Sequence, residues 1–123
     1  MASGGDKVVV IGAGNVGATA AYALMLRGLF TDVVLIDADP ARAEAEAIDI
    51  GDANALARPA RVRGGGYDEV GDADIVVLTA GAATHGDETR LSVAGRSAGI
   101  VRSCVEQVKA AGFAGVLVVA SNP

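Results

Sequence analysis

A glycine-rich segment near the start of the chain has the residue types and spacing of a phosphate-binding turn. Glycines stand at positions 12, 14 and 17 in the pattern Gly-x-Gly-x-x-Gly, and Asn15 and Val16 separate the last two. Gly12 suits a tight turn, Gly14 lets the backbone approach a pyrophosphate, and Gly17 lets a helix pack closely on a strand. A helix that begins here directs unpaired N–H groups and the positive end of its dipole at an anion. We therefore expect these five residues to bind a dinucleotide.

An acidic residue follows at the spacing that a dinucleotide requires. Asp37 ends the apolar segment 33–37 and lies 37 − 17 = 20 residues after Gly17. A carboxylate at this place can accept hydrogen bonds from the adenosine ribose hydroxyls. The same negative charge repels a 2′-phosphate, and residue 38 is Ala rather than a basic residue, so the sequence favours NAD over NADP. We interpret Arg42 as a residue of a helix face rather than a 2′-phosphate ligand.

Strand-like and helix-like segments alternate around these residues. Continuous apolar runs too short for helices are typical of strands buried on both faces of a parallel sheet, and they cover residues 7–11, 33–37, 75–79 and 116–120. Residues 61–63 suit a short edge strand. Helical composition covers residues 18–27, 41–57 and 89–111. The alternation predicts a Rossmann-type α/β fold in three layers, with a doubly wound parallel sheet of five strands in the order 3-2-1-4-5.

Composition excludes several classes of protein. The chain has 123 residues, a length that predicts one domain, which we place at residues 7–123 after a flexible leader of residues 1–6. Its formal net charge of −5 argues against nucleic-acid binding. No apolar run reaches the length of a membrane span, and no signal peptide is recognisable. A single cysteine, Cys104, excludes an internal disulfide and fits the cytoplasm; we interpret it as a small helix residue. One His and one Cys do not suffice for a metal site of N and S ligands.

Six short segments in this order resemble a known family. They are Val9–Gly14, Leu35–Ala38, Asp72–Val77, Thr79–Ala82, Glu88–Leu91 and Ser121–Pro123. Together they resemble the N-terminal, NAD-binding half of the L-lactate/malate dehydrogenases, which are L-2-hydroxyacid dehydrogenases. The glycine pattern is common to many families, whereas the Thr-Ala-Gly-Ala and Glu-Thr-Arg-Leu segments at this spacing are far more specific.

The resemblance implies roles for residues in the second half of the chain. Ala80, Gly81 and Ala82 match the segment that lies under the phosphates and nicotinamide ribose of the cofactor. Arg90 matches the mobile-loop arginine that closes over the substrate and polarises its carbonyl, which a guanidinium does well once water is excluded. Asn122 matches the asparagine that contacts the nicotinamide ribose and the substrate oxygen. By the same resemblance, a completed enzyme would use Arg90 in catalysis.

The chain also departs from the family pattern. Thr84 stands where lactate enzymes carry Gln and malate enzymes carry Arg, so the resemblance assigns no substrate. His85 lies in the same loop, but the family's histidine base belongs to the catalytic half, and we interpret His85 as an exposed loop residue. The catalytic base and the arginine that pairs with the substrate carboxylate come from that half, which we expect to be absent here. The chain is therefore expected to bind NAD(H) without transferring hydride to a 2-oxo acid.

Two other functions remain open at this point. A stand-alone regulatory Rossmann domain that senses nucleotides has a similar length, the same glycine loop and the same acid after its second strand. The segment 81–91, with its substrate-loop arginine, argues against that function. A scaffold that keeps the fold without binding a ligand is the other alternative. In each case we expect a homo-oligomer, because the strand at 116–120 has an apolar edge and the helix after Pro40 packs on a twin subunit in the family.

Overall fold

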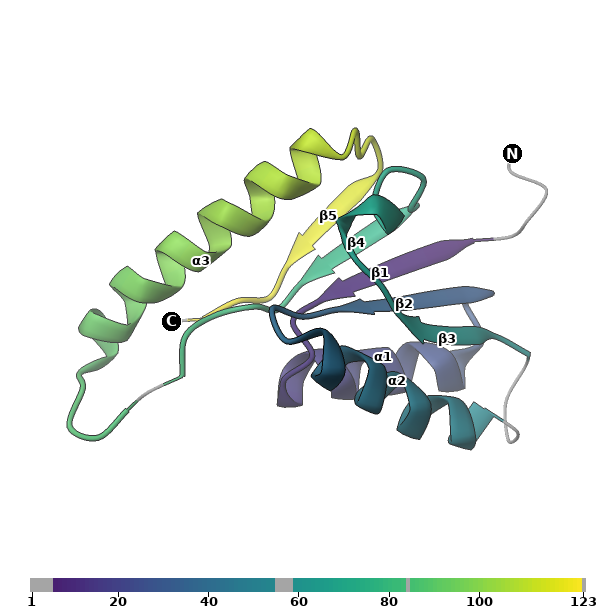
Figure 1. Cartoon of the computed structure of the whole chain (residues 1–123), viewed down its shortest axis with the longest axis horizontal. Coiled ribbons are helices and arrows are strands. Elements are labelled where there is room, and N and C mark those ends of the chain that lie inside the picture. Colours follow the sequence, from purple (N-terminus) through teal and green to yellow (C-terminus); the bar gives the residue numbers. More distant parts are fainter. Residues whose placement is uncertain (1–5, 55–58, 84, 123) are drawn as a thin grey trace.

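The computed structural model describes residues 6–54, 59–83 and 85–122, and it builds them around one parallel sheet (Figure 1). The strands are β1 (Lys7–Ile11), β2 (Asp32–Ile36), β3 (Arg61–Gly64), β4 (Ile75–Leu78) and β5 (Val116–Val119). The helices are α1 (Asn15–Arg27), α2 (Pro40–Ala53) and α3 (Arg90–Ala110), and a short 3-10 helix, η2, covers Tyr67–Glu69. Of the expected leader, only Asp6 lies within the described residues.

The strand order confirms the predicted topology. The sheet runs β3-β2-β1-β4-β5, and each neighbouring pair is parallel. At its centre, Val9 of β1 pairs with Val34 on one side and with Val76 on the other. The chain therefore winds outward from β1 in both directions, and the carboxyl ends of all five strands meet at one edge of the sheet.

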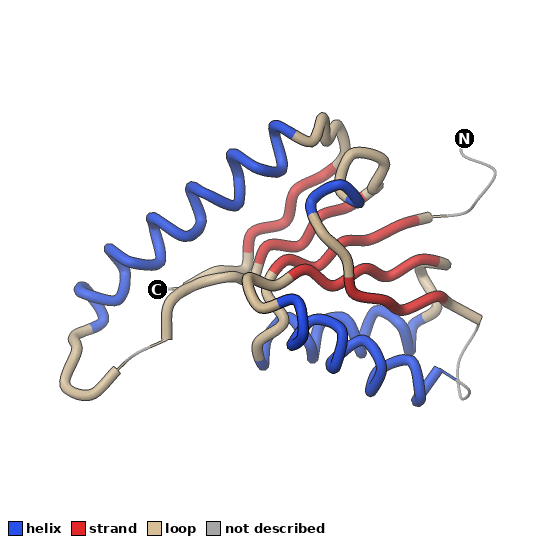
Figure 2. The backbone as a smooth tube through the Cα atoms, in the orientation of Figure 1, coloured by secondary structure: helices blue, strands red, loops and turns tan. Residues whose placement is uncertain are grey.

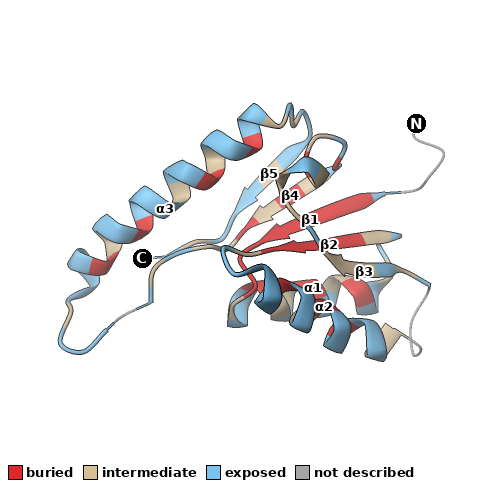
Figure 3. Cartoon of the chain, in the orientation of Figure 1, coloured by how far each residue is buried: buried red, intermediate tan, exposed pale blue. Residues whose placement is uncertain are grey.

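Helices cover both faces of the sheet, as the alternation predicts (Figure 2). Helices α1 and α2 pack on the face that carries Val8, Val10, Val33 and Leu35. Helix α3 and the turn η2 lie on the opposite face, over the side chains of residues 9, 11, 34 and 36. Burial is concentrated in β1 and β2, whereas β5 is largely exposed (Figure 3). None of the helices in the described ranges is long and apolar enough to cross a membrane.

Local signals place most of the helix ends. Asp39 caps α2 by accepting a hydrogen bond from the Ala41 N–H (3.1 Å), and Pro40 occupies the first helical position. Gly28 ends α1 in the left-handed conformation, with φ of 64°. Two expectations need adjustment. Helix α1 begins three residues earlier than the composition indicated, at Asn15, and α2 ends at Ala53, with Asn54 as its C-cap, rather than at residue 57. Residues 55–58 lie outside the described ranges.

The turn between β1 and α1 brings the backbone of β1 against the end of β4. Gly12 has φ of +103°, and a Cβ built on it would lie 2.8 Å from both the Ala80 nitrogen and Thr79 Oγ1. A Cβ on Gly17 would overlap the carbonyl oxygen of Gly12. A side chain at either position would therefore push α1 or β4 away from β1.

A network of charged side chains ties η2 to the opposite, amino-terminal end of the sheet. Lys7 Nζ lies 2.9 Å from a carboxylate oxygen of Glu69 and 2.7 Å from one of Asp72. Arg63 pairs with Glu69 and lies 2.9 Å from a carboxylate oxygen of Asp32. The hydrogen bond from Arg63, followed by that from Lys7, lowers the pKa of Glu69 to about 2.

Glu69→Gln should lower the free energy of unfolding by about 1 kcal/mol near neutral pH, since these ion pairs are partly exposed. The pKa of Glu69 is lower in the folded chain than its ordinary value of 4.5. Its stabilising contribution is therefore complete above about pH 4.5 and is lost as the pH falls toward 2. Urea unfolding at several pH values should show the free energies of unfolding of the unchanged chain and of Glu69→Gln becoming equal in acid. Glu106→Gln, on the exposed face of α3, should leave the dependence of the free energy of unfolding on pH unchanged. Parallel profiles for Glu69→Gln and the natural chain would contradict this account.

Gly12→Ala should destabilise the chain by about 2 kcal/mol or more, because it combines a positive φ with a steric clash. Gly14→Ala is the matched control for the fold, since a Cβ there would meet no atom within 4 Å. Thermal unfolding of the two variants should separate them by several degrees. Equal stabilities would show that the close approach of β1 to β4 carries little energy.

Candidate functional site

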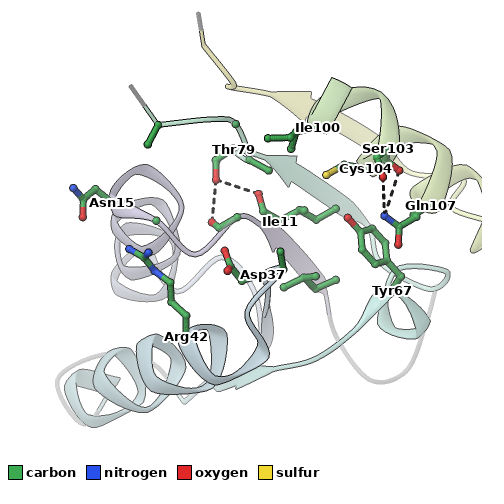
Figure 4. A pocket seen from close by; sticks show the side chains of 17 residues that line it. Ile11, Asn15, Asp37, Arg42, Tyr67, Thr79, Ile100, Ser103, Cys104 and Gln107 are labelled. Carbon is green, nitrogen blue, oxygen red and sulfur yellow. Dashed lines mark hydrogen bonds between the residues drawn. The ribbon is translucent and has the colours of Figure 1, made fainter. Parts of the chain in front are cut away.

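A cavity of about 710 Å³ opens at the carboxyl edge of the sheet, where β1, β2 and β4 end (Figure 4). One wall is formed by the glycine turn, the start of α1 and residues 36–38 after β2. The other wall is formed by Tyr67 of η2, residues 79–81 after β4 and the middle of α3. The volume is in the range of pockets that bind small molecules and cofactors. Two chain segments that leave neighbouring strands in opposite directions create this crevice.

The amino-terminal end of α1 faces this cavity without a side-chain cap. Gly14 is the N-cap residue, with φ of −74° and ψ of −167°, and it provides no side-chain hydrogen bond to the first turn. Its missing side chain leaves open space where a Cβ would project. Asn15, the first helical residue, lines the cavity beside it. The exposed N–H groups and the helix dipole together suit an anion such as a pyrophosphate.

Asp37 has two tasks at the end of β2. Its Oδ1 accepts a hydrogen bond from the Ala13 N–H at 2.8 Å, and its Oδ2 accepts one from the Asp39 N–H at 3.0 Å. The carboxylate therefore connects the glycine turn to the turn before α2. A carboxylate offers about four acceptor positions, so these two bonds leave capacity for the hydroxyls of a ribose. The structural task is one that the spacing argument did not anticipate.

Arg42 lies closer to the site than its interpretation as a residue of a helix face implied. It is exposed on α2, but its Nε donates a hydrogen bond to the carbonyl oxygen of Ala13 at 3.1 Å, and its side chain lines the cavity. Figure 4 shows Arg42 and Asp37 on the same side of the pocket, below the start of α1. A positive and a negative side chain thus flank the same end of the cavity.

The segment that follows β4 is attached to its neighbours by hydroxyl groups. Thr79 Oγ1 lies 3.0 Å from the carbonyl oxygen of Gly12 and 3.1 Å from that of Ile11 (Figure 4). Ser121 Oγ, beyond β5, donates to the carbonyl oxygen of Ala80 at 2.6 Å. These contacts continue the attachment of the chain past the last ladder bonds of β4. They fix the wall of the cavity opposite Asp37.

Sequence reasoning missed the far wall of the cavity. It consists of Tyr67, Ile100, Ser103, Cys104 and Gln107. Partial burial, followed by the influence of the neighbouring Cys104 thiol, raises the pKa of Tyr67, so its hydroxyl stays protonated. Cys104 is a helix residue, as expected; it is buried in α3 and also borders the pocket. A 3-10 turn has too few residues for a periodic pattern, and the inner face of α3 resembles any buried helix face.

The structure brings six of the expected cofactor residues to the cavity and places the others around it. Those that line it are Gly12, Gly14, Asn15, Asp37, Ala80 and Gly81. Val16 is 57% exposed on α1, Gly17 serves the packing of α1 on the turn, and Ala82 bonds to α3. The carbonyl oxygen of Asn122 lies over Gly81, 3.4 Å from where a Cβ would be. Thr84, the expected specificity residue, lies outside the described residues.

Arg90 is the first residue of α3 and is exposed, next to a loop that is held at several points. Thr89 caps the helix by accepting the Ser92 N–H at 3.1 Å. Glu88 accepts the backbone N–H of His85 at 2.8 Å and pairs with Arg96 at 2.6 Å. His85 itself is exposed, as expected. These contacts hold the loop against α3, with Arg90 outside the cavity lining.

Comparison with known proteins agrees with this arrangement. Residues 6–123 match the family model described as the lactate/malate dehydrogenase NAD-binding domain. The L-lactate dehydrogenase of Bacillus caldolyticus is 46% identical over 122 residues, which is 98% of this chain and 38% of that enzyme. The L-lactate dehydrogenase of Clostridium botulinum strain Hall is 43% identical over 117 residues. The chain thus spans about two-fifths of the length of these relatives.

Solved structures give the same result. A ligand-bound minor L-lactate dehydrogenase from Enterococcus mundtii superposes with a TM-score of 0.91 and 43% identity, over 96% of this chain and 38% of that one. The malate dehydrogenase of Cryptosporidium parvum superposes with a TM-score of 0.84 and 30% identity, with the same coverage. With the family model covering almost the whole sequence, the chain belongs to the lactate/malate dehydrogenase family as its NAD-binding domain.

Proposed function

We propose that the cavity holds NAD(H) with its adenosine ribose on Asp37, its pyrophosphate on the amino-terminal end of α1 and its nicotinamide half on the segment after β4. The observation that carries this assignment is the uncapped start of α1, which faces the same cavity as Asp37. Gly14 leaves room for the pyrophosphate, and Asp37 keeps free acceptor capacity for the ribose.

We also propose that the site prefers NAD to NADP. Asp37 is held in place by two backbone N–H groups, so it cannot turn away from a 2′-phosphate without losing both bonds. Arg42 stands beside it and would attract such a phosphate. The carboxylate decides the preference because it occupies the position that the ribose hydroxyls approach, whereas the guanidinium lies over the glycine turn.

Calorimetric titration of the chain with NADH and NADPH tests both proposals. NADH should bind saturably and at least tenfold more tightly than NADPH. Asp37→Ala should weaken the binding of NADH by about tenfold or more. It should also reduce the difference in affinity between NADH and NADPH, because the repulsion between the carboxylate and the 2′-phosphate is removed while Arg42 remains. Asp52→Ala, which removes the same charge from an exposed position of α2, should change neither affinity. Tighter binding of NADPH by the natural chain would refute the assignment of Asp37, and no binding of either would favour the scaffold alternative.

The comparisons give the regulatory alternative no support. The longer relatives are lactate and malate dehydrogenases, and we propose that the protein to which this domain belongs oxidises a 2-hydroxy acid with NAD. In that enzyme Arg90 would close over the substrate, Asn122 would contact the nicotinamide ribose, and Thr84 would influence substrate choice. The exposed position of Arg90 at the start of α3 is consistent with a residue that moves to meet its ligand. By itself the chain would bind the cofactor without turning over lactate or malate.

We propose the cytoplasm as its location, since Cys104 is a free thiol.

We propose that the chain forms homo-oligomers, because two of its surfaces expose apolar side chains. Val116, Val118 and Val119 of the edge strand β5 are 61%, 45% and 55% exposed, and Ile48 of α2 is 56% exposed. An apolar edge strand is a template for association, and so is an apolar helix face.

Sedimentation velocity should therefore show a species larger than the monomer. Val118→Lys should dissociate it if β5 mediates the contact, and Ile48→Lys should do so if α2 does. Either substitution places a charge at the centre of its own surface, so each serves as the control for the other. A natural chain that sediments as a monomer at every accessible concentration would rule out self-association.

A further inference from the structure

Ser97 is a buried polar residue that the cofactor assignment does not use. Its side chain is only 1% exposed and lies on the inner face of α3, whose other buried residues, Val93, Cys104 and Val108, are apolar. Its hydroxyl oxygen accepts a hydrogen bond from the backbone N–H of Ala82 at 3.0 Å. Burying a hydroxyl on an apolar helix face costs free energy unless the hydroxyl forms a hydrogen bond. Here its partner is the segment after β4.

This bond acts where the sheet no longer holds the chain. The β4 ladder ends at Leu78, so the peptide groups around Gly81 have no strand partner in the described sheet. A Cβ on Gly81 would lie 3.4 Å from Ser97 Oγ and 3.4 Å from the carbonyl oxygen of Asn122. The Gly81 peptide is therefore confined between α3 and the segment after β5, and the Ser97 hydroxyl sets its distance from α3.

The sheet order shows which part of a dinucleotide would meet this peptide. Strands β2, β1 and β4 are adjacent, and their carboxyl ends carry Asp37, the glycine turn and Gly81 respectively. A ligand with its adenosine on Asp37 and its pyrophosphate at Gly14 continues in the same direction toward Gly81. Gly81 thus faces the half of the ligand that lies beyond the pyrophosphate.

We propose that Ser97 is a positioning residue: by holding the Ala82 N–H, it orients the Gly81–Ala82 backbone toward the nicotinamide half of the bound dinucleotide. This inference rests on the proposed cofactor assignment. It makes a selective prediction, because Ser97 touches neither the adenosine end nor the glycine turn. The loss of its hydroxyl should weaken the binding of a complete dinucleotide and leave unchanged the binding of a ligand that ends at the pyrophosphate.

The test compares NADH with ADP, which has the adenosine and the pyrophosphate but no second nucleoside. Calorimetric titration of Ser97→Ala should show about tenfold weaker binding of NADH, the effect of one lost hydrogen bond with its donor left unpaired, and less than a twofold change for ADP. Ser92→Ala, on the exposed side of the same helix, is the matched control and should leave both affinities unchanged. Hydrogen exchange of the Ala82 amide, followed by NMR, should accelerate in Ser97→Ala alone.

A second pair of variants guards against a simple loss of folding. Ser97→Thr and Ser97→Val have the same shape, and only the threonine keeps the hydroxyl, so the ratio of NADH to ADP affinity should be preserved in the first and lowered in the second. If removal of the hydroxyl lowered the affinities for NADH and ADP equally, or left the affinity for NADH unchanged, the role of Ser97 would be overturned. A natural chain that binds ADP and NADH with equal affinity would also overturn it, whereas one that binds neither would overturn the cofactor assignment on which it rests.

Discussion

The central position of β1 is the constraint on which the rest of this structure depends. β1 is hydrogen-bonded on both sides, to β2 and to β4, and its residues 8–10 are completely buried. A strand in that position cannot twist or shift without breaking two ladders. The turn that follows must therefore fit the space between β2 and β4, and only a glycine at position 12 allows the approach to Ala80. The crevice at the carboxyl edge exists because the chain leaves β1 toward one face and β4 toward the other.

Beyond the ends of the strands, hydrogen bonds from side chains replace those of the sheet in holding the chain in place. Asp37 links the glycine turn to α2, Thr79 reaches the carbonyl groups at the end of β1, and Ser97 holds Ala82 from α3. Each contact joins a segment that lines the cavity to an element that the sheet already fixes. A site built in this way has its polar backbone groups oriented before a ligand arrives, which reduces the entropy lost on binding.

The opposite end of the sheet serves the site indirectly. Glu69 lies between Lys7 and Arg63, and these bonds fix η2 across the amino-terminal end of the strands. Tyr67, at the other end of η2, lines the cavity and is half-buried beside Cys104. The charge network thus determines where one wall of the pocket stands, although none of its charged residues lines it.

The sequence by itself determined the strands and the glycine turn, because these depend on local chemistry, and the expected strand order followed from the doubly wound fold that they indicate. A run such as Val8–Ile11 favours a buried strand wherever it occurs, and the spacing from Gly17 to Asp37 follows from the length of one βαβ unit. Only the tertiary structure decided the far wall of the cavity, the turn of Arg42 toward Ala13 and the bond from Ala82 to Ser97. These contacts join residues 15 or more positions apart, and no local pattern encodes which side chains the folded sheet and helices bring together.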